Sequence, residues 1–552
     1  MMDDDASVRI EIKDDAGPDM TGAEAALRHH AAHAENEIAF VDPPDRAKRG
    51  MGQPRSLTFA DADIIADRIA GRFLGCGLST GDIIALQMPN TIEAPLLILG
   101  AWRAGLVVCL MPLLWRLDEI NRAFSQIKAK AAVTVARYGD ENSAQTLGEA
   151  AAKNPSVRFV FAFGEDLPDG VTPIDDWLTD DGASDRDTGT PREPARPDQR
   201  AIITWTVLRQ DACPVPRTHG EIAALAKMFS NQMKLGGGAR VLNTYPYSSI
   251  GAVAGQLVAP LLAGAQIVLH LPFSFDVFVE QLQENEITYT ALPASVISAL
   301  EERCDLHSRE QPLARIGCVW PNPHGVNSGP NLFETPLPIF DIHNFAELAI
   351  LVRERNPGAD PSLLPLGKIY LPGEEDAGDP VLETRVRGAV THEESQQVLR
   401  GTLCVRGSTV PAGPLSLAGT VIEPDSHGFL DTGIGCAVDE SIAGQFRCQK
   451  SEDLIYHGGA VIAASELDKL YAEFPEFLDA AAFVLDDAVI GERIFAAVVP
   501  KPEVAPSLDR LKAFLSQKRV APYKTPDQLV IVKSIPRSGQ GAVQRDRILG
   551  HI

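Results

Sequence analysis

The sequence predicts an α/β protein with two related α/β layers in one large N-terminal domain, followed by a small α+β domain. Three observations predict this fold class. Segments with helical spacing alternate with short β-branched runs between residues 57 and 300, one helix–strand plan occurs twice, and the composition changes at about residues 436–452. Alternating helices and strands are typical of parallel sheets joined by right-handed crossovers.

The elements are predicted in order from the N-terminus. Residues 57–77, "LTFADADIIADRIAGRFLGCG", have helical spacing and end in glycine, and residues 81–90 are predicted to be a strand and a turn. "LILGAWRAGLVVCLMP" (97–112) and "LVAPLLAGAQIVLHLP" (257–272) share an apolar helix, an Ala-Gly stop, a β-branched run and a proline. Glycine after a helix supplies its left-handed cap, and the apolar run suits a strand covered on both faces. Residues 275–300 are predicted to be helix, strand, proline turn and helix.

Three further segments set the predicted boundaries. The acidic residues 1–25 are predicted to be a mobile tail, and residues 175–199, rich in Asp, Gly and Pro, to be a loop within the domain. We expect a large domain over residues 26–448 and a small domain over residues 449–552, with the division near Glu452.

Composition excludes several classes of function. With 552 residues, 45% of them hydrophobic and 22% charged, the chain is predicted to be globular with more than one domain. A formal net charge of −24 repels phosphate backbones and anionic headgroups, so we expect no nucleic-acid partner. The most apolar stretch, residues 94–115, approaches membrane-span length, but Arg103 and Gly105 interrupt it and Pro112 follows, so we expect no membrane span.

The termini and cysteines indicate a cytoplasmic protein. The N-terminus lacks the basic and then apolar order of a signal peptide. The eight cysteines form no C-x-x-C pair and have no histidine partners at metal-ligand spacing, so we expect reduced structural thiols.

The order of several segments resembles the adenylate-forming superfamily of AMP-dependent synthetases and ligases. The resemblance covers roughly residues 25–552 and is carried by "FLGCGLSTGDIIALQMPNTIEAPLLILGAWRAGLVVCLMPLL", "YPYSSIGAVAGQLVAPLLAGAQIVLHLPF", "GTLCVRGSTV" with "DSHGFLDTGIG", "KSEDLIYHGGAVIAASELDKL" and "APYKTPDQLVIVKSIPRSGQGAVQRDRI". It implies two related αβαβα layers plus a smaller β subdomain, and a small mobile C-terminal domain that rotates about a hinge. It also implies acyl-CoA synthetase chemistry with ATP, Mg²⁺ and CoA as cofactors, and a small carboxylate, an acyl-CoA or a carrier protein as partner.

The family's triphosphate loop corresponds to "WTVLRQDACPVP", residues 205–216. Such a loop needs glycines so that backbone donors can approach the anion. This segment has no glycine, two prolines that lack N–H groups, and Cys213 at the family's lysine position. Arg209 could offer charge to a phosphate, but a solvated loop cation is the favoured interpretation.

The family's Mg²⁺ and adenine region corresponds to "HNFAE", residues 343–347. Glu347 keeps a hard oxygen ligand suited to Mg²⁺, while Asn344 and Ala346 replace the family's Gly and Thr. Two interpretations of Glu347 stay open: a metal ligand, or an ordinary exposed or capping acid. Upstream, Trp320 either offers an adenine stacking face or fills the core.

The ribose and hinge positions are partly kept. The family's Thr-Gly-Asp becomes Thr432, Gly433 and Ile434, and an isoleucine cannot accept a hydroxyl proton. Lys450 stands where the family has an arginine that contacts the ribose, which keeps the charge but loses the forked donor geometry. The hinge position corresponds to Glu452, followed by Asp453.

Ala542 stands at the position of the family's catalytic lysine, which neutralises the reacting carboxylate and phosphate. A preorganised cation of this kind is typically worth a factor of about 10² to 10³ in rate. A single Lys-to-Ala replacement would account for Ala542 but not for the glycine-free loop, Cys213 and Ile434. The resemblance places the acyl pocket at residues 245–255, with Tyr247, Ser248 and Gly251.

Other chemistries have weaker support. Asp431 in "FLDTGIG" resembles an aspartic-protease motif, but no second motif with the same apolar approach supplies the required partner carboxylate. Cys213 with His219 suggests a thiol nucleophile only by sequence proximity. Two functions stay open: a catalytically silent relative that binds an acyl or CoA-like ligand or a protein partner, which is favoured, and a working carboxylate–CoA ligase with a rebuilt nucleotide site. A homo-oligomer is compatible with either.

Overall fold

The computed structural model describes residues 22–179, 195–208, 211–270, 272–304, 306, 312–320, 323–324, 337–356, 358–371, 379–393, 396–417, 420–439, 444–487, 489–548 and 550. Most of the predicted tail lies outside these residues, and helix α1 (Ala23–His33) begins within its last part. The predicted loop at 175–199 lies outside them over residues 180–194, after a short 3₁₀ helix at Asp175–Leu178.

The large domain contains two mainly parallel sheets, as the alternation of helices and strands predicts. One sheet has seven strands in the order β7-β6-β5-β3-β4-β8-β9, and the other has eight in the order β15-β14-β13-β12-β10-β11-β1-β2. The first consists of β3 (Ile83–Leu86), β4 (Val107–Leu110), β5 (Ala131–Val135), β6 (Phe159–Phe163), β7 (Thr172–Pro173), β8 (Arg200–Leu208) and β9 (Asp211–Thr218). The second consists of β1 (Ile38–Val41), β2 (Ser56–Thr58), β10 (Arg240–Asn243), β11 (Gln266–Leu269), β12 (Tyr289–Pro293), β13 (Arg315–Trp320), β14 (Ile339–Phe345) and β15 (Ala349–Glu354).

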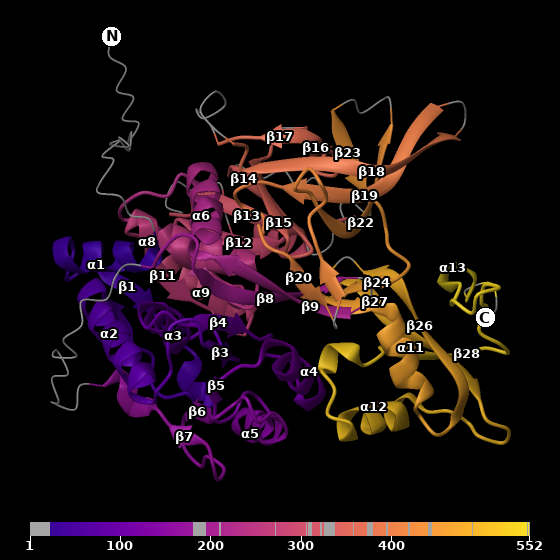
Figure 1. The fold of residues 1–552 in the computed structure, drawn as a ribbon, viewed down its shortest axis with the longest axis horizontal. Coiled ribbons are helices and arrows are strands. Elements are labelled where there is room, and N and C mark those ends of the chain that lie inside the picture. Colours follow the sequence, from indigo (N-terminus) through magenta and orange to yellow (C-terminus); the bar gives the residue numbers. More distant parts are fainter. Residues whose placement is uncertain are drawn as a thin grey trace.

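Helices form three layers around these sheets, so the predicted αβαβα arrangement is confirmed (Figure 1). The central core between the sheets takes its side chains from α2 (Phe59–Gly75), α3 (Glu93–Arg103), α6 (His219–Met233), α7 (Ile250–Val253) and α8 (Ala259–Ala263). The outer face of the first sheet is covered by α4 (Leu117–Ile127) and α5 (Ser143–Lys153), and that of the second by α9 (Phe275–Glu284) and α10 (Ala294–Arg303). Both copies of the helix–strand plan fold as predicted, as α3–β4 and as α8–β11.

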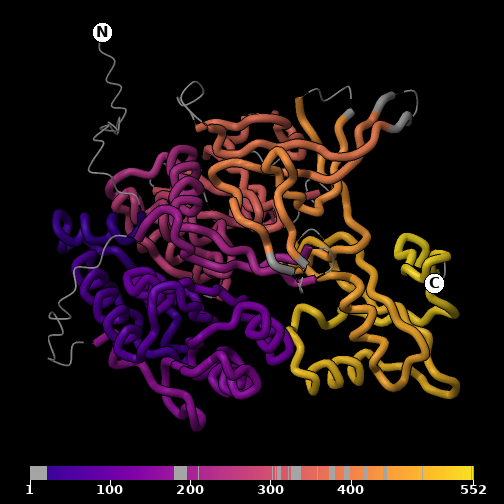
Figure 2. Tube along the Cα trace, in the orientation of Figure 1, coloured from indigo at the N-terminus to yellow at the C-terminus, as the bar shows by residue number. Residues whose placement is uncertain are grey.

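A smaller β subdomain and the small C-terminal domain complete the chain (Figures 1 and 2). The subdomain sheet has the order β16-β23-β22-β19-β18-β17. Its strands are β16 (Leu364–Pro365), β17 (Gly367–Ile369), β18 (Leu382–Glu393), β19 (Gln396–Arg406), β22 (Leu430–Asp439) and β23 (Gln445–Cys448). The small domain contains β24 (Leu454–His457), β25 (Ala460–Ala463), α11 (Ala464–Ala472), β26 (Phe477–Asp487), β27 (Gly491–Pro500), α12 (Leu508–Gln517), the 3₁₀ helix η6 (Pro522–Lys524), β28 (Gln528–Ile531) and α13 (Arg545–Ile548).

The stretch at residues 94–115 folds into α3 and β4. The Arg103 side chain is fully buried and pairs with Asp63 and Asp67 on α2, which accounts for a charge within this apolar segment. Across the described ranges, no helix combines the length and the apolar character needed to cross a membrane.

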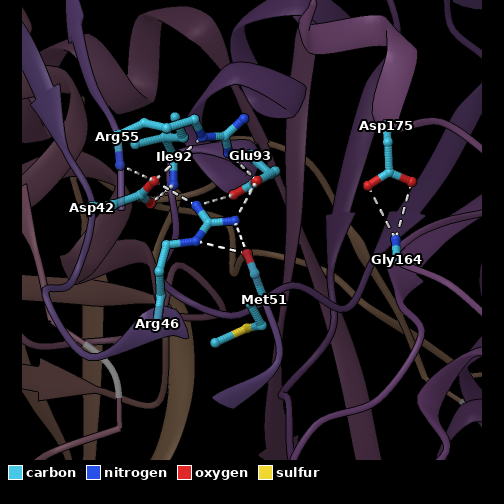
Figure 3. Close-up of polar contacts among 8 residues, drawn as sticks. All are labelled: Asp42, Arg46, Met51, Arg55, Ile92, Glu93, Gly164 and Asp175. Atoms are coloured by element: carbon cyan, nitrogen blue, oxygen red, sulfur yellow. Dashed lines mark hydrogen bonds and ion pairs between the residues drawn. The ribbon is translucent and has the colours of Figure 1, made fainter. Parts of the chain in front are cut away.

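A second buried ionic cluster attaches the N-terminal segment to α3 (Figure 3). Arg46 donates to Glu93 at 2.9 Å, to the Met51 carbonyl at 2.8 Å and to Asp42. Arg55 pairs with the same two carboxylates. Burial and the charge of Glu93 raise the pKa of Asp42, whereas Arg55 and Arg46 outweigh burial and lower the pKa of Glu93. Each buried charge therefore has an opposite charge beside it, as buried ions require.

Candidate functional site

The segment predicted to replace the triphosphate loop is a β-hairpin. β8 and β9 pair antiparallel, from Trp205 opposite Pro214 to Leu208 opposite Asp211, and Arg209 lies outside the described residues. Backbone groups in an antiparallel ladder bond to the opposite strand. The hairpin therefore uses alternate amide donors to pair its two strands, and Pro214 and Pro216 have no N–H to donate, whereas a phosphate-binding loop directs its amides at an anion.

One face of this hairpin is apolar and buried. Leu208 and Cys213 lie in the same core cluster as Ile434 of β22. A Cβ atom built on Gly433 would lie 4.0 Å from Leu208 Cδ2, so the hairpin approaches the turn that carries the family's ribose position. Burial raises the pKa of Cys213 to about 12, which suits a structural thiol better than a nucleophile.

The residues at the ribose position are engaged within the protein. Thr432 is 1% exposed, and its hydroxyl donates to the Leu403 carbonyl at 2.8 Å and accepts from the Ile434 amide at 3.2 Å. Gly433 has a φ of 72°, which a glycine adopts without strain. Asp431 pairs with Arg387 on β18, so this carboxylate serves the β subdomain.

Glu347 lies at the turn between β14 and β15, and its carboxylate bonds to the start of α7. Its two oxygens accept from the Ser249 hydroxyl at 2.9 Å, the Ile250 amide at 2.8 Å and the Asn344 side-chain amide at 2.5 Å. Glu347 is 8% exposed and has a φ of 57°, a strained conformation for a residue with a Cβ. These contacts engage both oxygens of the carboxylate that the sequence leaves open between a Mg²⁺ ligand and an ordinary acid.

Arg217 of β9 binds the backbone of the same turn between β14 and β15. Its buried guanidinium donates to the carbonyls of Glu347 at 2.8 Å, Leu348 at 2.9 Å and Thr409 at 2.7 Å. Burial lowers the pKa of Arg217 to about 10, and the charges of Glu221 and Glu347 oppose that shift. Arg217 of β9 thus ties the turn between β14 and β15 to Thr409, which follows β19, without a ligand.

Trp320 is 4% exposed and belongs to the core on the outer face of the eight-stranded sheet. Its indole N–H donates to Asp341 at 2.9 Å, and Asp341 pairs with Arg355. The ring lies 6.2 Å from His343, with the two planes within 12°. The contacts of Trp320 are those of a core residue, which favours the second of the two interpretations of the sequence.

Two of the predicted acyl-pocket residues, Tyr247 and Ser248, lie beside β3 and β4 of the seven-stranded sheet, whereas Gly251 on α7 packs against β15. Tyr247 and Ser248 line a cavity of ≈ 10 Å³, which is room for about one water molecule. Tyr247 is 4% exposed, and its burial raises the pKa of the phenol. A Cβ atom at Gly251 would lie 3.3 Å from Ile350, so this glycine permits close packing.

The small domain carries the predicted hinge residues and Ala542. Lys450 pairs with Asp486 and lies 3.2 Å from Glu492, and the Asp453 amide donates to the Ser451 hydroxyl at 3.2 Å. The Glu452 carbonyl accepts from Arg545 at 3.1 Å.

Ala542 is exposed in a turn whose Ser538 amide donates to the Ala542 carbonyl at 2.8 Å. Figure 1 shows α13, which follows this turn, on the side of the small domain away from β8 and β9.

The hairpin, α4 and the small domain line a cavity of ≈ 240 Å³ that is open to solvent. Val207 and Asp211 of the hairpin, Arg122 of α4, and Glu466 and Lys469 of α11 are among its lining residues. Across the described ranges, no group of three or more His, Cys, Asp or Glu residues is placed to hold a metal ion.

Sequence reasoning did not find Glu119 and Lys524, which pair across the two domains at 2.6 Å. The separation of 405 residues gives no local signal of this contact.

Residues 27–319 match the AMP-binding enzyme family, and residues 466–542 match the AMP-binding enzyme C-terminal domain. The chain therefore belongs to the AMP-binding enzyme family, as its resemblance to the adenylate-forming superfamily predicts. Sulfoacetate–CoA ligase of Cupriavidus necator is 25% identical over 521 residues, which cover 90% of this chain and 92% of the relative. Oxalate–CoA ligase of Arabidopsis thaliana is 23% identical over 92% of this chain and 96% of the relative.

Solved structures share the fold. Amide bond synthetase McbA of Marinactinospora thermotolerans superposes with a TM-score of 0.72 at 18% identity, over 96% of this chain and 99% of that one. An o-succinylbenzoate CoA synthetase of Bacillus subtilis superposes with a TM-score of 0.68 at 17% identity, over 95% of this chain and 97% of that one. These likenesses confirm the predicted α/β architecture with a large and a small domain.

Proposed function

We propose that this chain is a catalytically silent or strongly impaired relative of the acyl-CoA synthetases, which binds an acyl or CoA-like ligand or a protein partner and does not adenylate a carboxylate. The observation that carries the proposal is the β8–β9 hairpin. Its Leu208 packs beside Gly433 and Ile434, where the family places the triphosphate and the ribose.

A triphosphate leaves water only if donors and cations replace its hydration. In this chain residues 205–208 pair with residues 211–214 in a ladder, Pro214 and Pro216 have no N–H to donate, and the face toward β22 is apolar. An anion placed against this apolar face would lose its hydration without gaining hydrogen bonds from these side chains. This energetic argument supports the loss of ATP handling.

The reacting centre also lacks its cation. Ala542 carries no charge and lies in an exposed turn. Without a preorganised cation the rate falls by a factor of about 10² to 10³, even where the substrate binds.

A ligand without a triphosphate has room elsewhere. The cavity between the domains measures ≈ 240 Å³, against ≈ 10 Å³ beside Tyr247 and Ser248. Small-molecule sites typically measure about 300–1,000 Å³, so the larger cavity suits part of a chain-like ligand.

A working carboxylate–CoA ligase is the second candidate. The similarity to sulfoacetate–CoA and oxalate–CoA ligases over nearly the whole chain favours it. Glu347, Glu452 and Asp453 stand at the family's positions and favour it as well.

Nucleotide binding separates the two candidates. The purified chain is titrated with ATP and Mg²⁺ while its unfolding temperature is followed, and carboxylate-dependent exchange of pyrophosphate into ATP is measured in parallel. A site saturated at a hundred times its Kd stabilises a protein by about 2.7 kcal/mol. We expect no shift and no exchange, with sulfoacetate–CoA ligase of Cupriavidus necator as the positive control. A clear shift together with exchange contradicts the proposal and establishes the ligase.

A further inference from the structure

An ionic cluster with a buried centre joins the two domains at the wall of the cavity between them. It consists of Glu119 and Arg122 on α4 and of Glu466 and Lys524 in the small domain, and we call these four residues the interdomain latch. Lys524 Nζ lies 2.6 Å from Glu119 Oε1 and 2.9 Å from Glu466 Oε1. The side chains of Lys524 and Glu119 are 5% and 4% exposed, so solvent does not weaken their pairing.

Every member of the latch is held by more than one contact. Glu119 Oε1 also accepts from the Ala521 amide at 3.2 Å, and its other oxygen accepts from the Arg116 amide at 3.0 Å. Arg122 lies 2.6 Å from Glu466. Burial raises the pKa of Glu466, but the charges of Lys524 and Arg122 outweigh burial and lower this pKa overall. The geometry therefore suits one relative position of the two domains.

Neighbouring contacts reinforce that position. Tyr523 packs both against the large-domain core on the outer face of the seven-stranded sheet and against the small-domain core. Arg519 pairs with Glu149 on α5 and donates to the Thr146 hydroxyl at 2.5 Å. Figure 1 shows α4 and α5 on the side of the large domain that faces the small domain.

Because Glu119 and Lys524 are buried, the latch favours one orientation of the small domain relative to the large domain. Another docked orientation that covered Glu119 without Lys524 would leave the buried Glu119 carboxylate without its cation, which is strongly unfavourable. A rotated small domain would also lose the two-sided packing of Tyr523.

We propose that the interdomain latch holds the small domain in this single orientation without any bound ligand, so that the hinge at Glu452 does not rotate at rest. The turn with Ala542 then stays away from the hairpin. This proposal does not depend on whether the protein binds nucleotide, because none of the latch residues lies at the family's nucleotide positions.

The test removes one charge at a time and follows domain docking. Trypsin cleavage after Lys450, next to the hinge, and small-angle X-ray scattering are measured on the full chain and on Lys524→Met. We expect the hinge of Lys524→Met to be cut at least tenfold faster, with a larger radius of gyration. Lys524→Arg, which keeps the charge, restores slow cleavage.

Lys518→Met is the matched control, because Lys518 pairs with Glu473 within the small domain. We expect it to behave as the unmodified chain does. If Lys524→Met does not fold, Arg519→Met gives the same readout from the rim of the interface, with an expected increase of about threefold. An unmodified chain that is cut as fast as Lys524→Met, or whose scattering requires several orientations, overturns the proposal.

Discussion

His343 has an unusual environment for an ionisable residue. It is 1% exposed and lies between Trp320 at 6.2 Å and Phe345 at 6.4 Å, with all three ring planes nearly parallel. Neither ring nitrogen has a hydrogen-bond partner among the residues that the structure describes. Burial lowers the pKa of His343 to about 3; the charges of Arg353 and Arg355 contribute, and Asp341 opposes them. The imidazole is therefore neutral in the folded protein.

This neutral histidine predicts a loss of stability in acid. Between pH 6.5 and about 3 the unfolded chain binds a proton at His343 that the folded chain does not, so stability falls as the pH falls. From pH 7.5 to pH 5.5 the unmodified chain is expected to lose about 1.4 kcal/mol of unfolding free energy through this proton. We expect His343→Phe not to show this loss. Urea unfolding at the two pH values measures the difference.

The exposed His427 supplies the control for this prediction. His427→Gln is expected to keep the pH dependence of the unmodified chain. Equal pH dependence in His343→Phe and the unmodified chain would show that His343 titrates normally when folded.

Individual site residues were predictable in identity but not in their contacts. The sequence showed that Glu347 is kept and that Ile434 and Ala542 lack the family's functional groups. It could not show that Glu347 bonds to Ser249, because 98 residues separate the two and only the crossing of β14 and α7 brings them together. The assignment of Glu347 to Mg²⁺ stays a prediction.

Among the elements, the β8–β9 hairpin and β22 form one apolar contact. The absence of glycine in residues 205–216 predicted that this segment is not a phosphate cradle, but the sequence was aligned as a loop and did not predict two paired strands. Pairing places Leu208 and Cys213 on the buried side, where they meet Ile434. The alternation of apolar and polar residues that produces this face is short, and two prolines interrupt it. The two-residue period of a strand was therefore only a weak signal in this segment.

This contact predicts the result of restoring the family's residue at the ribose position. Ile434→Asp places a carboxylate among aliphatic side chains, so we expect it to destabilise the protein by about 3–5 kcal/mol, as an unpaired buried charge does. The loss is expected to be larger at pH 8 than at pH 5, because burial raises the pKa of a carboxyl group and protonation relieves the charge. Denaturant unfolding measures both effects.

Ile434→Val is the matched control and is expected to cost about 0.5–1.5 kcal/mol, the usual effect of one buried methylene. Neither variant is expected to gain a thermal shift with ATP and Mg²⁺. An Ile434→Asp protein that is as stable as the unmodified chain and responds to ATP would show that the cleft is open at this position.

For the whole molecule, the layered architecture followed from the sequence because each unit is local. A helix, its glycine stop and its strand lie within about 20 residues, so their pattern is visible without knowledge of distant contacts. The relative position of the two domains was not predictable in this way. It depends on pairs such as Glu119 and Lys524, and on Tyr523, whose partners come from two cores.

This interface predicts how the domains unfold. Because Tyr523 and the latch belong to both domains, we expect differential scanning calorimetry of the full chain to show one coupled transition. Lys524→Met removes the central charge and leaves Glu119 unpaired, so the small domain is expected to melt separately and at a lower temperature than the large domain. Lys518→Met, whose ion pair lies within the small domain, is expected to keep the single transition. Two transitions in the unmodified chain, with a spacing that Lys524→Met leaves unchanged, would mean that the domains unfold independently and that the buried ion pairs do not couple them.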